Sequence, residues 1–172
     1  GAEQVVFSIF CSGERTDTAV GRASGKVIRE GEMVMSALAV QYEGYIASDE
    51  WPFVAGNRPR PDQSTLIDHI IQAEAAGIQG LKAGRMAGEV VRQVRRYFQD
   101  HGLGAYDIYP PIHGNGLAEA ESPYPDAASS YPFEAGMGIN FDVNLFKVPT
   151  LGSNRIEEGF IITEEGVRPL SR

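Results

Sequence analysis

One histidine in a glycine-rich turn and two acids inside apolar segments are the residues in this sequence best suited to chemistry. His113 is followed by Gly114 and Gly116, which lack side chains and so let a ligand or a neighbouring strand approach the imidazole. Asp142 and Glu157 lie in stretches rich in β-branched and aromatic residues, where an acid is costly to bury unless it is paired or holds a metal. These residue types can transfer protons or bind a divalent cation.

The composition excludes several classes of protein. The chain has 172 residues with 15 Lys+Arg against 23 Asp+Glu, and the net charge of −8 argues against a nucleic-acid or anionic-membrane surface. A single cysteine, Cys11, excludes an internal disulfide framework, so we expect a cytoplasmic protein. No apolar run approaches the roughly 18 residues of a membrane span, and the first residues do not resemble a signal peptide.

Two kinds of periodicity predict the elements that position these residues. Apolar, β-branched runs predict strands in the first and last parts of the chain, whereas apolar residues recur every three or four positions in the middle. The expected strands span residues 5–11, 33–42, 45–53, 137–143, 154–157 and 160–163, and the expected helices span residues 64–76 and 86–98. This order indicates an α+β fold with helices on one face of an antiparallel sheet.

The order of several motifs resembles one known catalytic domain. The motifs are His113-Gly114-Asn115-Gly116-Leu117, Glu121-Ser122-Pro123, Gly136-Met137, Asp142, Arg155-Ile156-Glu157-Glu158 and Ile162-Thr163-Glu164-Glu165-Gly166. Their order and spacing resemble the C-terminal half of the "pita-bread" catalytic domain shared by Xaa-Pro dipeptidases (prolidases), Xaa-Pro and methionine aminopeptidases, and creatinase. Upstream residues, among them Lys26, Glu32 and Glu50, extend the resemblance over nearly the whole chain and are similar to creatinase in particular.

The resemblance implies a fold and a class of reaction. The fold would be the α+β pita-bread (creatinase/aminopeptidase) fold, an antiparallel curved sheet with helices on its outer face. One such domain would span residues 1–172, N-terminally truncated and lacking the first helical segment. The activity would be hydrolysis of a C–N or peptide bond in a small-molecule or dipeptide-like substrate. We also expect a homodimer, with neither nucleic acid nor membrane as a partner.

The metal site of the family is only partly present by position. Its peptidases hold two divalent metals with two Asp, one His and two Glu, and the resemblance places His113, Asp142 and Glu157 at three of these positions. The two Asp positions fall on Ala37 and Ser48, neither of which is a plausible ligand. We therefore expect no full dinuclear centre and at most one divalent ion, which would be manganese, cobalt, iron or zinc.

Other residues of the pattern imply roles in catalysis and substrate binding. His113 would act as an acid/base together with Glu50, which is similar in position to a substrate-binding Glu of creatinase. If the fold brings them to the same pocket, Arg15, Asp49 and Arg155 would bind the charged ends of a zwitterionic substrate.

Three hypotheses of function remain open from the sequence. The first is a diverged hydrolase of the Xaa-Pro dipeptidase or creatinase type. The second is a non-catalytic binding or scaffold module, because Ala120 and Val20 replace two accessory histidines of the family and the charged residues could merely pair with one another. The third is a mononuclear metal enzyme whose ligands are Asp49, His113, Asp142 and Glu157.

Overall fold

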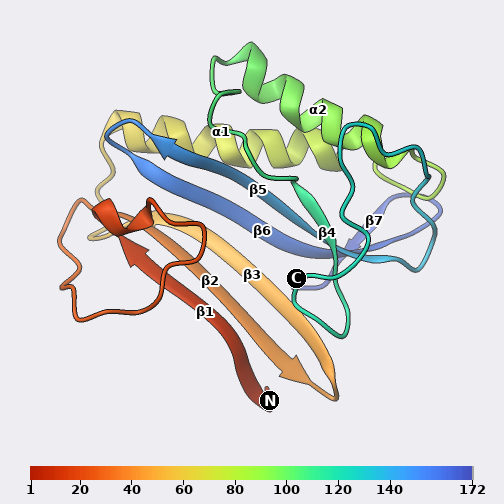
Figure 1. The fold of residues 1–172 in the computed structure, drawn as a ribbon, viewed down its shortest axis with the longest axis horizontal. Coiled ribbons are helices and arrows are strands. Elements are labelled where there is room, and N and C mark those ends of the chain that lie inside the picture. The colour runs from red at the N-terminus through yellow and green to blue at the C-terminus, as the bar shows by residue number, and fades with distance from the viewer. Residues whose placement is uncertain (172) are drawn as a thin grey trace.

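An antiparallel sheet of seven strands is the scaffold of the molecule, which a computed structural model describes over residues 1–171. The strands lie in the order β1-β2-β3-β6-β5-β4, with the short β7 beside β6 (Figure 1). They are β1 (Gln4–Ser12), β2 (Met33–Tyr42), β3 (Tyr45–Val54), β4 (Ile112–Gly114), β5 (Gly138–Val148), β6 (Gly152–Ile162) and β7 (Val167–Pro169). A short 3₁₀ helix, Gly13–Thr16, follows β1. This arrangement confirms the expected antiparallel α+β architecture.

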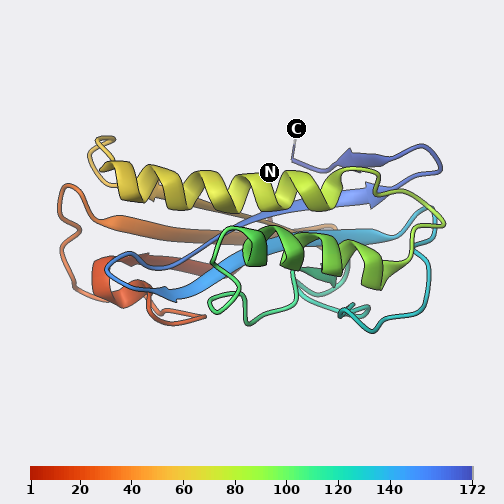
Figure 2. The ribbon, with the colours of Figure 1, turned by 90° about the horizontal axis from the view of Figure 1, so that it is seen from above.

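Two helices, α1 (Pro61–Ile78) and α2 (Ala87–Asp100), cover the β5–β6 half of the sheet (Figures 1 and 2). Their apolar faces pack into one core with residues of β5 and β6 such as Phe141 and Ile156. The helix residues in this core include Leu66, Ile70, Ala73, Val90, Val91, Val94 and Phe98. Neither helix, nor any other among residues 1–171, is long and apolar enough to cross a membrane.

A glycine allows α1 to pack closely on the sheet. The backbone of Gly77 lies so near the Phe141 ring and the Val94 side chain that a Cβ at this position would collide with both. Glycine normally destabilises a helix interior relative to alanine, because it loses more conformational freedom on folding. Here its lack of a side chain sets the distance between α1 and β5.

Strand pairing joins the two halves of the sheet at one pair of residues. Over the described chain, β3 and β6 are paired only through Glu50 and Glu157, whereas the β2–β3 and β5–β6 hairpins are paired along most of their length. The same row continues to Ala37 on β2 and to Asp142 on β5. Residues in one cross-strand row lie next to each other on one face. Three buried acids therefore stand side by side at the centre of the sheet.

The structure differs from the sequence expectation at β6. The sequence predicts two short strands, residues 154–157 and 160–163, but the structure has one continuous strand. Gly159 lies between the two predicted segments and stays paired with Asn140 of β5. A Cβ at Gly159 would lie 3.1 Å from both the Asn140 side chain and Leu170. Glycine at this position makes room for its neighbours and does not end the strand.

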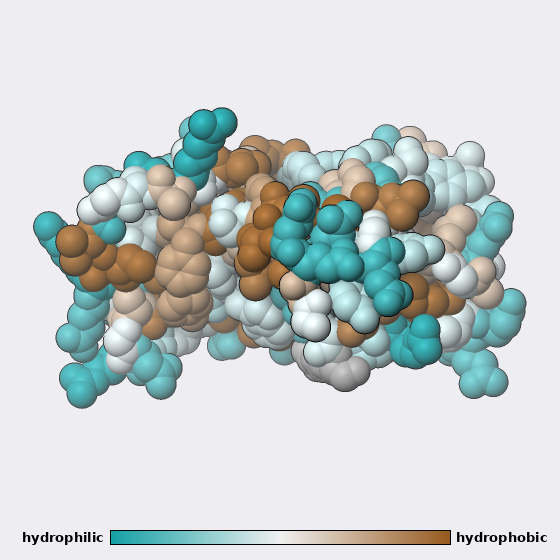
Figure 3. Space-filling view, turned by 90° about the horizontal axis from the view of Figure 1, so that it is seen from below, coloured by the Kyte–Doolittle hydropathy of each residue, from teal (hydrophilic) through white to brown (hydrophobic). Residues whose placement is uncertain are grey.

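Strands β1–β3 expose apolar side chains on the face that turns away from the buried acids. Phe10, Leu38, Trp51 and Phe53 are all partly exposed, and the rings of Phe10 and Phe53 have their centres 6.0 Å apart. The two α-helices pack mainly against the β5–β6 half, and the short 3₁₀ helix contacts β1, β2 and β6. The view from below in Figure 3 likewise shows apolar groups scattered among polar ones.

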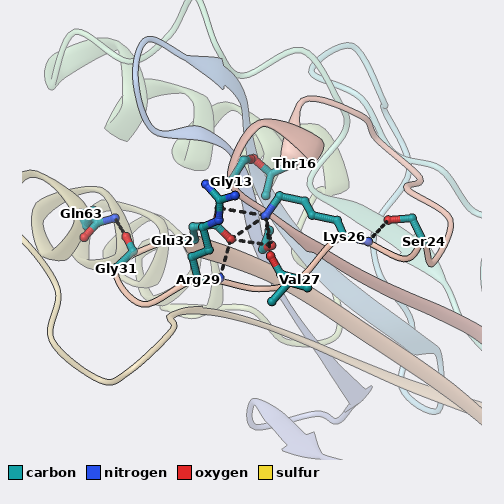
Figure 4. A network of polar contacts seen from close by, with 10 residues as sticks. Gly13, Thr16, Ser24, Lys26, Val27, Arg29, Gly31, Glu32 and Gln63 are labelled. Carbon is teal, nitrogen blue, oxygen red and sulfur yellow. Dashed lines mark hydrogen bonds and ion pairs between the residues drawn. The ribbon is translucent and has the colours of Figure 1, made fainter.

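An ion pair anchors the long loop between the 3₁₀ helix and β2. Lys26 Nζ donates to both carboxylate oxygens of Glu32, at 2.8 and 2.6 Å, and to Ser12 Oγ at 3.0 Å (Figure 4). The hydrogen bond from Lys26, followed by that from the Arg29 N–H, lowers the pKa of Glu32 to about 2. Lys26 and Glu32, which extend the sequence resemblance upstream, therefore hold this loop against the end of β1.

Candidate active site

Three buried residues from three neighbouring strands form the centre of the site. His113 lies on β4, Asp142 on β5 and Glu157 on β6, and strand pairing sets Asp142 opposite Glu157. Each of the three is at most 2 % exposed. One possible ligand atom from each residue lies within 4.8 Å of the other two. The sheet thus brings together the histidine and the two acids that the sequence indicates as best suited to chemistry.

Glu50 and Arg155 complete a charged cluster on the same face. Glu50 enters from β3, opposite Glu157, and Arg155 lies two residues before Glu157 on β6. The Nε atom of Arg155 forms an ion pair with Glu50 Oε2, and its Nη1 atom lies 3.9 Å from Asp142 Oδ2. Among the described residues, Arg155 is the only Lys or Arg that forms an ion pair with these acids. It therefore supplies the positive charge that offsets them.

Neutral side chains donate hydrogen bonds to Glu157. Ser48 Oγ donates a 2.6 Å hydrogen bond to Glu157 Oε1, and the Asn140 amide donates to both Ser48 Oγ, at 2.6 Å, and Glu157 Oε1. The Asn115 amide in turn donates to Asn140 Oδ1. His113 Nδ1 donates to the Gly114 carbonyl at 2.9 Å, and its Nε2 atom lies 3.7 Å from Glu157 Oε1. This carboxyl group is therefore held in a defined orientation.

The carboxyl groups of the cluster bind protons more tightly than ordinary acids do. Burial, and then the Asp142 charge, raises the pKa of Glu157 to about 8. Burial likewise raises the pKa of Glu50 and of Asp142, against the opposing effect of the Arg155 guanidinium. For Arg155, burial lowers the pKa, but the surrounding acidic groups, led by Glu50 and Asp142, together raise it by more. Without a bound cation, the cluster therefore retains a carboxyl proton at neutral pH.

Some residues that interact with the site are not singled out by the sequence. Burial, followed by the Asp142 charge, raises the pKa of Tyr109 to about 12. The Glu119 charge raises the pKa values of all three acids in the cluster. Asn140 is also missed, although it precedes Asp142 by two positions on an apolar strand and so must share its face. That alternation is a signal available in the sequence.

Two of the expected substrate-binding residues lie apart from this cluster. Asp49 lies between Ser48 and Glu50 on β3, so its side chain faces the opposite side of the sheet. Arg15 lies in the 3₁₀ helix, where its Nη2 atom donates to the Arg22 carbonyl at 2.8 Å. Of the three residues expected to bind substrate, the structure brings only Arg155 into the cluster.

The donor set of His113, Asp142 and Glu157 fits a divalent ion. Asp142 Oδ1 is buried and accepts no hydrogen bond from the described residues, so this oxygen is available to an ion. Together with His113 and Glu157 it offers the carboxylate and imidazole donors that manganese, cobalt, iron or zinc accept. The two further ligand positions hold Ala37, which has no donor atom, and Ser48, whose hydroxyl is already hydrogen-bonded to Glu157 and Asn140.

Comparisons with known proteins identify the family of this chain. The model of metallopeptidase family M24 matches residues 1–164. The Xaa-Pro dipeptidase of Pyrococcus furiosus is 30% identical over 100% of this chain and 49% of its own length, and the peptidase YqhT of Bacillus subtilis, described as uncharacterized, is 31% identical over 99% of this chain and 48% of its own. The chain thus spans about half the length of these curated relatives.

Solved structures show the same relationship in three dimensions. The prolidase from Pyrococcus furiosus superposes with a TM-score of 0.93 at 30% identity, covering 100% of this chain and 51% of that one. The Xaa-Pro dipeptidase from Bacillus anthracis superposes with a TM-score of 0.92 at 29% identity, covering 100% of this chain and 48% of that one. The sequence, the sheet with its two helices and these superpositions agree, and the chain belongs to metallopeptidase family M24, with the pita-bread fold of its prolidase neighbours.

Proposed function

We propose that this protein hydrolyses a C–N bond in a small amino-acid-like substrate, such as the peptide bond of a dipeptide, with a single divalent ion. The observation that carries the proposal is the buried group of His113, Asp142 and Glu157, whose ligand atoms lie within 4.8 Å of one another. The Xaa-Pro dipeptidases among its relatives support the class of substrate. The missing donors at Ala37 and Ser48 support one ion in place of two.

The residues of the cluster have different roles in such a reaction. When an ion is bound, it polarises a carbonyl and lowers the pKa of a water molecule. His113 Nε2 and the carboxylate oxygens of Asp142 and Glu157 would hold this ion. Glu50, whose pKa burial raises, is the group that takes a proton from water and delivers it to the departing nitrogen. Arg155 positions Glu50 and reduces the mutual repulsion of the acids.

The charge of the site favours a substrate with a positive end. With a divalent ion bound, Arg155 and the ion balance the three acids of the cluster, and Glu119 adds a further negative charge nearby. A substrate ammonium group reduces this excess of negative charge, whereas a substrate carboxylate increases it. We therefore expect a free amino group or a guanidinium group in the substrate. The same argument predicts that metal affinity rises with pH, because the ion displaces the proton held on Glu157.

Metal analysis and a substrate panel test this function together. The purified protein is loaded with manganese, cobalt, iron or zinc, its metal content is measured, and hydrolysis of Xaa-Pro dipeptides, other dipeptides and guanidino compounds is followed. We expect one ion per chain and metal-dependent turnover. Glu157→Gln should lose both the ion and the turnover, and Glu50→Gln should keep the ion but lose turnover.

The matched control for Glu50→Gln is Asp49→Asn. The two residues are neighbours on β3 and carry the same charge, but only Glu50 faces the cluster. Asp49→Asn should leave turnover and metal content unchanged. Turnover that survives complete removal of metal would contradict the role of the ion and would transfer the proton-handling role to His113.

A second function, a non-catalytic binding or scaffold module, is favoured by one specific feature. Arg155 already pairs with Glu50, and Ser48 with Asn140 already binds Glu157, so much of the cluster is satisfied by its own residues. Structural ion-pair networks have this character. A chain that binds no metal, turns over no member of the panel and keeps its stability in Glu157→Gln would support this function over hydrolysis.

A further inference from the structure

Two histidines and a tyrosine come together where α1 and α2 pack against each other, away from the candidate active site. His69 lies in α1, Tyr97 lies near the end of α2, and His101 follows one turn later. The two imidazole ring centres are 4.9 Å apart, and Tyr97 lies beside both rings, at 6.0 Å from His69 and 4.2 Å from His101. His69 and Tyr97 are partly buried, and His101 is exposed.

Tyr97 orients both imidazoles through their Nδ1 atoms. His101 Nδ1 lies 2.7 Å from the Tyr97 carbonyl oxygen, which can only accept, so Nδ1 carries the proton and Nε2 carries a lone pair. His69 Nδ1 lies 3.1 Å from the Tyr97 hydroxyl oxygen, which can accept a hydrogen bond from it in the same way. A hydrogen bond from the second ring nitrogen to a carbonyl or similar acceptor is the usual support of a histidine that binds a metal.

We propose that His69 and His101 bind one late transition-metal ion, Zn²⁺, Ni²⁺ or Cu²⁺, through their Nε2 atoms, with water completing the coordination. At metal–nitrogen distances of about 2.0–2.1 Å, two imidazoles on one tetrahedral ion have ring centres roughly 5 Å apart. The observed separation of 4.9 Å is close to this value. The ion would fasten the middle of α1 to the end of α2.

The chemistry of this pair separates it from the active-site cluster. Imidazole ligands select zinc, nickel and copper, whereas a site made largely of carboxylate also accepts manganese or magnesium. The pair lies on the helices, which cover the face of β5 occupied by Phe141, and the cluster lies on the face occupied by Asp142. The two sites therefore share no residue, and manganese, which suits the cluster but not an imidazole pair, distinguishes them.

Nuclear magnetic resonance with Cu²⁺ as the probe tests the proposal residue by residue. In the ¹⁵N-labelled full chain, Cu²⁺ is expected to broaden the signals of His69, Tyr97 and His101 at substoichiometric amounts. Any binding at His113 is read separately from its own signals. His69→Asn and His101→Asn should each weaken binding at the helix pair at least about tenfold, and Tyr97→Phe, which removes only the hydroxyl, by about 10–100-fold.

Asp100→Asn is the matched control, because it removes an exposed charge beside His101 and keeps both imidazoles. Its Cu²⁺ affinity should equal that of the unchanged protein. The proposal is overturned if equimolar Cu²⁺ does not broaden the helix-pair signals of the unchanged protein, or if either histidine can be replaced without loss of affinity. The first of these outcomes needs no variant, so a variant that fails to fold does not prevent a decision.

Discussion

Replacement of Arg155 by methionine tests whether the guanidinium offsets the free-energy cost of burying the acids of the cluster. Arg155 is 7% exposed and forms an ion pair with Glu50, which is 1% exposed, and it also lies 3.9 Å from an oxygen of Asp142. Methionine fills much of the same space without a charge. Arg155→Met therefore leaves the acids of the cluster without the cation that offsets them.

The expected cost follows from the burial of this pair. Removal of one partner of a buried ion pair costs about 3–5 kcal/mol, because the other charge stays buried and unpaired. Glu50 can limit this loss by taking up a proton, since burial already raises its pKa. Keeping Glu50 protonated costs about 1.4 kcal/mol for each pH unit above its pKa. We therefore expect a loss of about 3 kcal/mol at pH 8 and a clearly smaller loss at pH 5.5.

Urea unfolding at the two pH values measures this loss, with the fluorescence of the single tryptophan, Trp51, as the signal. The matched control is Arg168→Met on β7, which removes an exposed arginine and should change the free energy of unfolding by no more than about 0.5 kcal/mol. Arg155→Met combined with Glu50→Gln should be more stable than Arg155→Met alone, because the carboxylate that pairs with the missing guanidinium is then removed as well. Equal losses in Arg155→Met and Arg168→Met would refute the reasoning.

Three further predictions concern protons and packing. The pKa of Glu157 is raised from 4.5 to about 8 in the folded state, so between these pH values the folded state binds an additional proton. The free energy of unfolding therefore falls as pH rises from 4.5 to about 8. Urea unfolding should show a weaker fall with pH in Glu157→Gln. Gly77→Ala should destabilise the protein by about 1–3 kcal/mol through collision with the β5 core, whereas Gly25→Ala, whose Cβ meets nothing within 4 Å, should be neutral in the same assay. Lys26→Met should raise the pKa of Glu32 from about 2 toward 4.5, as measured by carboxyl NMR. In the unchanged protein the lowered pKa stabilises the fold above pH 4.5, and this stabilisation is lost as pH falls from 4.5 to about 2. The variant should lack this contribution.

The helices, most strands and the fold family could be predicted from the sequence because they rest on local patterns and on motif spacing. Periodicity locates the apolar faces of α1 and α2, and the motifs around His113 and Glu157 identify the family. The continuity of β6 is not predicted, because the role of Gly159 depends on Asn140 and Leu170, which are distant in the sequence.

The site could be predicted only in part, for a geometric reason. His113, Asp142 and Glu157 are found from residue type and context, and the structure places them together. Asp49 and Glu50 are equally acidic neighbours, but alternation along β3 allows only one of them to face the cluster. The contact of Arg155 with Glu50 depends on the pairing of β3 with β6, and no local pattern carries that information.

The sparse pairing between β3 and β6 gives the molecule a modular character. The chain up to the end of β3 and the chain from α1 onward each fold back on themselves. In the described residues, strand pairing between these two pieces is confined to Glu50 and Glu157, beside a backbone hydrogen bond from the Ile46 N–H to the Gly116 carbonyl. Whatever neutralises these two acids therefore also strengthens the joint between the pieces. A ligand that binds these acids should therefore also raise the stability of the contact between the two pieces. A bound cation should accordingly slow hydrogen exchange of the Glu50 and Glu157 amides together, on both sides of the joint.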